Sequence, residues 1–210
     1  VAAFRKKALL DVGLWSEDMV TEDIDISWKL QTNFWDVRFE EHALCWILTP
    51  ETLQGLWKQR IRWAQGGAEV MLKYGRRLFD YRQRRFWPVY AEYLLSVLWC
   101  YAFWFSAFVG ALNLFFVLPE PYSMATIVPP EWTGTFLACV CMLQALVALS
   151  FDRHFETGTV KHIFWFIWYP MVYWILSAGA TAVGLPKAVL KVARKSGGVA
   201  VWDSPDRGLG

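Results

Sequence analysis

The chain has 210 residues, of which 56% are hydrophobic and 18% aromatic, and it contains 14 tryptophans. About half of the residues of an ordinary soluble domain are apolar, so this composition excludes a simple soluble domain of this size. The formal net charge is +2, but nine Lys and Arg residues lie between positions 58 and 85, against two acidic residues. We therefore expect a lipid bilayer as a partner, and no nucleic acid.

Residues 1–52 have the pattern of a soluble α/β domain. Residues 4–10 predict a short helix, which Gly13 ends. Thr21 is a favoured N-cap residue and predicts a helix that runs to about Gln31. The first residues resemble the interior of a domain, so we expect the chain to be the C-terminal part of a longer protein.

Two extended segments are predicted after this helix. Apolar and charged residues alternate over positions 37–40, which is typical of a short strand with one buried face. Residues 43–48 are mostly apolar and predict a second extended segment, which Pro50 ends.

A long amphipathic helix is predicted at residues 53–74, with Thr52 or Thr49 as its N-cap. Its basic residues, and the arginines that follow up to residue 88, favour a position at the interface between water and lipid. The alternative is a buried helix in the core of the soluble part. We treat residues 53–88 as an interfacial region.

One face of this helix carries three residues whose side chains can bind or orient a ligand. Gln59, Arg62 and Trp63 are spaced at i, i+3 and i+4, so an amide, a permanent cation and a large ring lie side by side. Gly66 and Gly67 follow, and they remove side chains where another group can approach closely.

Residues 89–185 form a predicted membrane region with three segments long enough to cross the hydrocarbon, which needs roughly 20 residues. These uncharged segments are residues 94–118, 133–151 and 163–185. The loop at 119–132 has no Lys or Arg and is expected outside, whereas Arg153 and Lys161 favour the inside for the next loop.

The basic tail, residues 186–210, conflicts with three full crossings because its Lys and Arg residues would then lie outside. The alternative is a third segment that is interrupted by Pro170, enters the membrane and returns. The sequence leaves both topologies open.

Two clusters of polar residues carry candidate chemistry. Thr21, Glu22 and Asp23 place two carboxylates at a helix N-terminus, where the helix dipole stabilises negative charge. A positioned carboxylate can accept a proton from an attacking hydroxyl group. The planar fork of Arg62 suits a diphosphate, and Trp63 can stack on a sugar ring. Taken separately, the acidic cluster is also an ordinary helix start, and Trp63 an ordinary packing residue.

No metal site is predicted from the histidines and cysteines. The chain has no Cys-x-x-Cys pair, and the histidines lack metal-ligand spacing. The residues in question are Cys45, Cys100, Cys139, Cys141, His42, His154 and His162. We expect the cysteines to be buried free thiols.

The two polar clusters together, followed by membrane segments, resemble the processive family 2 glycosyltransferases. Residues 21–31, 56–69 and 202–208 are most similar to the bacterial synthases of poly-β-1,6-N-acetyl-D-glucosamine that serve biofilm formation. The resemblance covers nearly the whole chain. It implies that residues 1–52 are the C-terminal part of a GT-A-like catalytic domain, and that the protein lies in the bacterial inner membrane with its catalytic part in the cytoplasm.

The resemblance also implies a role for each candidate residue. Asp23 would be the general base that deprotonates the acceptor hydroxyl, and Thr21 and Glu22 would hold the loop and the helix start. Arg62 would bind the donor diphosphate, and Trp63 would bind the terminal sugar of the growing chain.

Gln59 would orient the donor or the acceptor. The implied reaction is an inverting transfer from UDP-N-acetylglucosamine to a growing polysaccharide, with passage of the polymer through the membrane.

A Mg²⁺ or Mn²⁺ ion is expected by resemblance, held through an Asp-x-Asp motif that we do not find in this chain. Asp23-Ile24-Asp25 matches the Asp-x-Asp pattern but belongs to the acidic cluster. We expect Asp25 on the surface of its helix. We therefore expect residues 1–210 alone to make no polymer, which a turnover assay with UDP-sugar would contradict.

Several alternatives and partners remain open at this stage. The polymer can be hyaluronan, chitin or a cellulose-like chain, or the protein can be a non-catalytic membrane assembly subunit. By resemblance, we expect a small membrane accessory subunit. Activation by cyclic di-GMP is a further expectation, and Arg194, Lys195 or Arg207 would contribute to its binding if the tail is cytoplasmic. A transporter is disfavoured because the apolar segments contain no ionisable residue.

Overall fold

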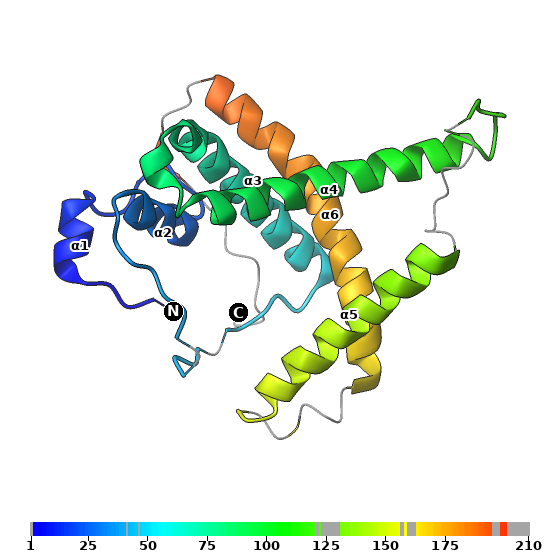
Figure 1. Cartoon of the computed structure of the whole chain (residues 1–210), viewed down its shortest axis with the longest axis horizontal. Helices are drawn as coiled ribbons and strands as arrows, with labels where there is room; N and C mark the ends of the chain where they lie inside the picture. Colours follow the sequence, from blue (N-terminus) through cyan, green and yellow to red (C-terminus); the bar gives the residue numbers. More distant parts are fainter. Residues whose placement is uncertain are drawn as a thin grey trace. The chain divides into compact units, whose positions relative to one another are not determined.

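The computed structural model describes residues 2–40, 42–45, 47–120, 122, 131–155, 158, 163–194 and 198–200. Within these residues all regular secondary structure is helical. The elements are α1 (Lys6–Asp11), α2 (Glu22–Thr32), α3 (Leu53–Tyr74), the short 3-10 helices η1 (Gly75–Phe79) and η2 (Tyr81–Gln83), α4 (Trp87–Leu112), α5 (Glu131–Asp152) and α6 (Ile163–Ala193) (Figure 1).

The chain divides into two compact units. The first contains the described residues of Val1–Leu98 and Gly179–Gly210, and the second is Trp99–Ala178. Helices α1 to α3 belong to the first unit, α5 belongs to the second, and α4 and α6 each continue from one unit into the other.

The predicted helices of the first unit are confirmed to within about two residues. Helix α3 has the predicted bounds, and Thr52 caps it because its Oγ1 accepts a hydrogen bond from the Gly55 amide at 3.0 Å. Helix α2 ends one residue beyond Gln31. Gly13 follows α1 with a φ of 77°, a left-handed conformation that glycine adopts without strain.

The strand predicted at residues 37–40 is wrong, and no strand occurs in the described part of residues 1–52. Phe39 is 93% exposed, so the alternation does not mark a buried face. A strand is stabilised by hydrogen bonds to a neighbouring strand, and none of the described segments supplies one. The segment predicted at 43–48 is irregular where it is described, so the α/β expectation for residues 1–52 is not confirmed.

An aromatic core joins α2 to α3 and to the start of α4. Trp28 of α2 lies at its centre, with ring centroids 4.9 Å from Phe86, 5.7 Å from Tyr90 and 6.1 Å from Tyr74. Val70 of α3 is also fully buried here. Burial of such large rings contributes most of the stabilisation available to a small core. The second half of α3 is therefore part of the core. A position at the lipid interface stays a prediction for the first half of α3, which is more exposed.

Asp25 is fully buried, which contradicts its expected position on the helix surface. Its Oδ1 accepts hydrogen bonds from Lys73 Nζ at 2.8 Å and from the Tyr74 hydroxyl at 3.2 Å. Asp25 lies four residues after Thr21 and three before Trp28, so it shares the face of α2 that packs on α3. Burial and the Asp25 carboxylate raise the pKa of Tyr74 above its usual range, so the hydroxyl stays protonated and donates.

Two helices are long and apolar enough to cross a membrane, judged by length and composition over the described residues. They are Trp87–Leu112, which is the whole of α4, and Val172–Ala193 of α6. Only 17% and 22% of their apolar stretches are buried, whereas the core helix of a soluble protein would be mostly buried. Helix α4 begins before residue 94 and ends before residue 118, so it is shifted toward the N-terminus relative to the predicted segment 94–118.

The predicted interruption of the third segment at Pro170 is wrong, because α6 is one continuous helix over Ile163–Ala193. The remaining membrane predictions are not tested. The described apolar stretch of α5, Cys139–Asp152, is shorter than a crossing requires. Most of the loop at 119–132 lies outside the described residues, as do Lys161, His162, Lys195, Arg207 and the tail stretch 202–208.

The first prediction concerns the ion pair between the buried Asp25 and the partly exposed Lys73. Replacing Lys73 with Met leaves the buried Asp25 carboxylate without its cation, which costs about 1–3 kcal/mol. We expect a clear fall in Tm by thermal unfolding in detergent. Lys73→Met combined with Asp25→Asn removes the buried charge and should be more stable than Lys73→Met alone.

Lys58→Met, at an exposed position of α3, is the matched control and should leave Tm unchanged. A double variant no more stable than Lys73→Met, or a Lys73→Met protein that unfolds with the control, contradicts this account of the pair.

Candidate active site

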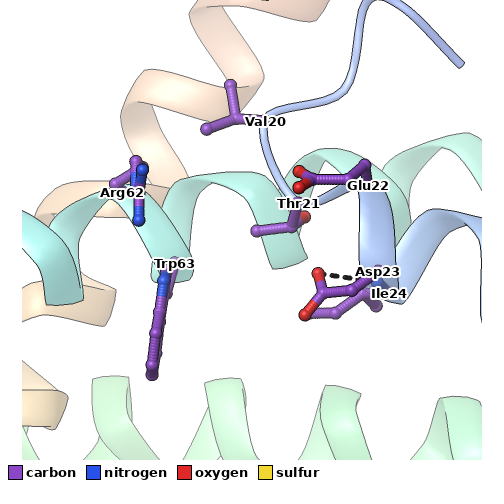
Figure 2. A pocket seen from close by; sticks show the side chains of 7 residues that line it. All are labelled: Val20, Thr21, Glu22, Asp23, Ile24, Arg62 and Trp63. Atoms are coloured by element: carbon purple, nitrogen blue, oxygen red, sulfur yellow. Dashed lines mark hydrogen bonds between the residues drawn. The ribbon is translucent and has the colours of Figure 1, made fainter. Parts of the chain in front are cut away.

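The two polar clusters of the sequence border one pocket of about 320 Å³. The pocket lies within the first unit and is lined by Val20, Thr21, Glu22, Asp23, Ile24, Arg62 and Trp63 (Figure 2). One side comes from the first turn of α2 and the residues just before it, and the other from the middle of α3. These two sides are distant in the sequence, and the packing of α2 on α3 brings them together.

A close approach at Gly66 brings the two sides together. A Cβ atom at Gly66 would lie 2.5 Å from Thr21 Cγ2 and 2.7 Å from Thr21 Oγ1, so a larger residue does not fit. Gly66 is one helical turn beyond Arg62 and Trp63. Next to it, the Tyr93 ring of α4 occupies the space that a side chain at Gly67 would need. The close approach predicted at this glycine pair is confirmed.

Thr21 occupies the N-cap position of α2 but does not cap the helix with its side chain. Its Oγ1 is buried and has no hydrogen-bond partner among the described residues. Packing against Gly66 directs this side chain toward α3 rather than toward the amides of α2. The predicted cap position is therefore confirmed, whereas the capping hydrogen bond is absent from the described structure.

The acidic side of the pocket carries two exposed carboxylates. Asp23 Oδ1 accepts a hydrogen bond from the Ile24 amide at 2.8 Å, which restrains the carboxylate. The Ser27 hydroxyl donates to the Asp23 carbonyl at 2.7 Å. In Figure 2 the carboxylates of Glu22 and Asp23 both point across the gap toward the side that carries Arg62 and Trp63. Both carboxylates can therefore contact a ligand held in the pocket.

The opposite side carries a cation and an indole ring. Trp63 is 42% exposed, which leaves much of its ring available. The guanidinium carbon of Arg60 lies 4.3 Å from the centroid of the Trp63 ring, an energetically favourable stacking distance. This contact restrains the indole. The sequence analysis gave Arg60 no role, although its i, i+3 spacing from Trp63 is the signal that finds it.

Gln59 is the predicted site residue that does not line the pocket. It lies one turn before Trp63 on α3 and is 7% exposed. Five of the six predicted residues therefore meet at the pocket: Thr21, Glu22, Asp23, Arg62 and Trp63. The sequence analysis missed Val20 and Ile24, because apolar residues beside a carboxylate carry no distinguishing signal.

The chemistry of the pocket is that of a base opposite an anion-binding group. A carboxylate can accept a proton, and a guanidinium can hold a phosphate through two parallel hydrogen bonds. No group of three or more His, Cys, Asp or Glu side chains that could hold a metal ion occurs among the described residues. Asp25 cannot complete an Asp-x-Asp site with Asp23, because its side chain is buried and paired with Lys73.

Comparison with known proteins places this arrangement in a family. Residues 1–177 match the family described as Glycosyl transferase family group 2. The chain is 39% identical over 207 residues to the poly-beta-1,6-N-acetyl-D-glucosamine synthase of Staphylococcus epidermidis, an alignment that covers 98% of this chain and 49% of that protein. It is 41% identical over 210 residues to the synthase of the same name from Staphylococcus aureus strain COL, with the same coverage.

The chain spans about half the length of the curated relatives it matches, since the alignments cover 49% of those proteins. No solved structure is significantly similar to it. The family match covers more than three quarters of the chain and includes every residue of the pocket. The chain therefore belongs to glycosyl transferase family group 2.

Proposed function

We propose that this chain is part of a processive, inverting hexosyltransferase. The protein transfers N-acetylglucosamine from UDP-N-acetylglucosamine to a growing poly-β-1,6-N-acetyl-D-glucosamine chain of a biofilm. The observation that carries the proposal is the shared pocket, in which the acidic side of α2 faces Arg62 and Trp63 of α3. Similarity of about 40% to two synthases of this polymer supports the choice of substrate.

Asp23 is the proposed general base. The 6-hydroxyl oxygen of the terminal sugar attacks C1 of the donor sugar, and the bond between C1 and the diphosphate oxygen breaks. The hydroxyl proton passes to the Asp23 carboxylate, and the electron pair of the broken bond leaves with UDP. Attack on the face opposite the leaving group inverts C1 and gives the β linkage. The Ile24 amide restrains the carboxylate in this role.

Arg62 is the proposed partner of the donor diphosphate. Charge increases on the leaving oxygen as the sugar–phosphate bond breaks, and a fixed guanidinium stabilises that charge. Glu22 and Thr21 hold the loop and the start of α2, and the buried Thr21 hydroxyl belongs to this edge of the pocket.

Trp63 is the proposed platform for the terminal sugar, because a flat indole matches the apolar face of a pyranose ring. Arg60 stacks on this ring and keeps it in place. Gln59 is buried one turn away, so we propose that it orients substrate through its neighbours on α3 rather than from the pocket lining.

We also propose the cellular setting. Helices α4 and α6 cross the bacterial inner membrane, α5 is the third membrane segment, and the polymer passes through this region from a cytoplasmic site. Residues 1–52 are the C-terminal part of a GT-A catalytic domain. A small accessory subunit and cyclic di-GMP are proposed partners. A Mg²⁺ or Mn²⁺ ion would neutralise the diphosphate, and no step above passes through it.

The rival from another class is a non-catalytic assembly subunit that keeps the same scaffold. Asp23→Asn separates the two, because it preserves shape and removes the base. We expect polymer synthesis by the full-length protein in membrane vesicles to fall about 10²- to 10⁴-fold, the usual contribution of a general base. Immunoblotting should show normal expression. Synthesis at the wild-type rate would favour the assembly subunit.

Arg62 allows a second test of the proposed site. Lysine keeps the charge but cannot form two parallel hydrogen bonds, so Arg62→Lys should retain more activity than Arg62→Ala, and both should be less active than wild type. Steady-state kinetics with radiolabelled UDP-N-acetylglucosamine measure kcat and kcat/KM. Arg76→Ala, at an exposed position of η1, is the matched arginine control. Equal kinetics for Arg62→Ala and the control would contradict the diphosphate role.

A further inference from the structure

The end of α6 contacts both α3 and the segment before α2, which carry the two sides of the pocket. Lys191, in the last turn of α6, forms an ion pair with Glu69 of α3 at 2.7 Å. The same Nζ donates a hydrogen bond to the Asp18 carbonyl at 3.1 Å, three residues before Thr21. One ammonium group therefore links α3 to the segment that leads into the acidic side of the pocket.

Glu69 is held for this contact. Its side chain is 2% exposed, and its other oxygen accepts a hydrogen bond from Gln65 Nε2 at 2.9 Å. Gln65 lies two residues after Trp63, and Glu69 lies two helical turns after Arg62 on the same face. A buried carboxylate with both oxygens paired fixes its partners more firmly than an exposed ion pair does.

Two further contacts act at the same places. Gly184 of α6 packs on α3 so closely that a Cβ would lie 2.8 Å from Ala64 Cβ and from the Gln65 amide nitrogen. Beyond α6, the Ala200 amide donates to the Glu17 carbonyl at 2.7 Å. We name Gly184, Lys191 and Ala200 the C-terminal contacts. Gly184 contacts α3 at the two residues that follow Trp63. Lys191 and Ala200 contact the segment before α2 at Asp18 and Glu17.

From this arrangement we propose that Lys191 is a positioning residue of the transferase, which fixes the separation between the Thr21–Asp23 side and the Arg62–Trp63 side of the pocket. Lys191 does not line the pocket. The proposal rests on the proposed function, because it assumes that reaction requires both sides at a set distance. Small displacements of reacting groups lower the rate of the chemical step more than they weaken binding.

The kinetic test uses the full-length protein in inverted membrane vesicles with radiolabelled UDP-N-acetylglucosamine. Lys191→Met and Glu69→Gln should each lower kcat by about tenfold or more with little change in KM, the pattern of a loss confined to the transition state. Lys191→Arg keeps the cation and should recover most of the rate. Lys187→Met, an exposed residue one turn earlier on α6, is the matched control.

A double variant separates positioning from general destabilisation. If Lys191 acts through Glu69, then Lys191→Met with Glu69→Gln should be no slower than either single variant, because the second change removes nothing further. Rates are normalised to folded protein measured by thermal unfolding. A normal kcat for Lys191→Met, or a raised KM at unchanged kcat, overturns the proposal.

A second measurement does not depend on polymer synthesis. Spin labels at Glu17→Cys and Lys58→Cys, both exposed, report the distance between the segment before α2 and α3. The four native cysteines are first replaced by serine. Lys191→Met should broaden the distance distribution, and Lys187→Met should leave it narrow. An unchanged distribution overturns the positioning role, whereas absence of polymer from the wild-type protein overturns only the proposed function.

Discussion

The pocket exists because a threonine packs against a helix position that has no side chain. Thr21 fills the space beside Gly66, and even a single added carbon at Gly66 would lie 2.5 Å from it. Dispersion forces fall steeply with distance, so this packing is stable only while the two helices stay in close contact. The Asp23 carboxylate and the Arg62 guanidinium come from distant parts of the sequence, and this contact places both on one pocket. The geometry of the site thus depends on the absence of a Cβ atom.

Two ion pairs with buried carboxylates lie near this helix contact, one between α2 and α3 and one between α3 and α6. Asp25 lies one turn into α2 from Thr21 and pairs with Lys73 of α3, and Glu69, one turn before Lys73, pairs with Lys191. A buried ion pair adds little net stability over apolar packing, but it penalises every arrangement in which one charge is left alone. Slippage of α2 along α3 would separate the buried Asp25 carboxylate from Lys73. The Asp25–Lys73 pair therefore favours one register of these two helices over its neighbours.

Local signals in the sequence were sufficient for α1 to α3 and for the spacing of most of the site residues. The helical period predicts the observed bounds of α3, and the i, i+3, i+4 spacing predicts that Arg62 and Trp63 lie side by side. Tertiary contacts decide what the local signals cannot. Asp25 was expected on the surface because aspartate is usually exposed, but Lys73 lies 48 positions away and supplies the partner that permits burial. The strand at 37–40 fails for the same reason, since pairing is non-local.

Helix α6 contains both an apolar stretch and the residue that contacts the elements of the site. Its stretch Val172–Ala193 is apolar enough for lipid, and Lys191 lies in the last turn of this same continuous helix. A helix transmits displacement along its axis because each residue is hydrogen-bonded to the one four positions earlier. A shift of the apolar stretch along that axis therefore moves the Lys191 ammonium relative to Glu69 and Asp18. Such a shift would change the separation between the two sides of the pocket without any change in the pocket residues themselves.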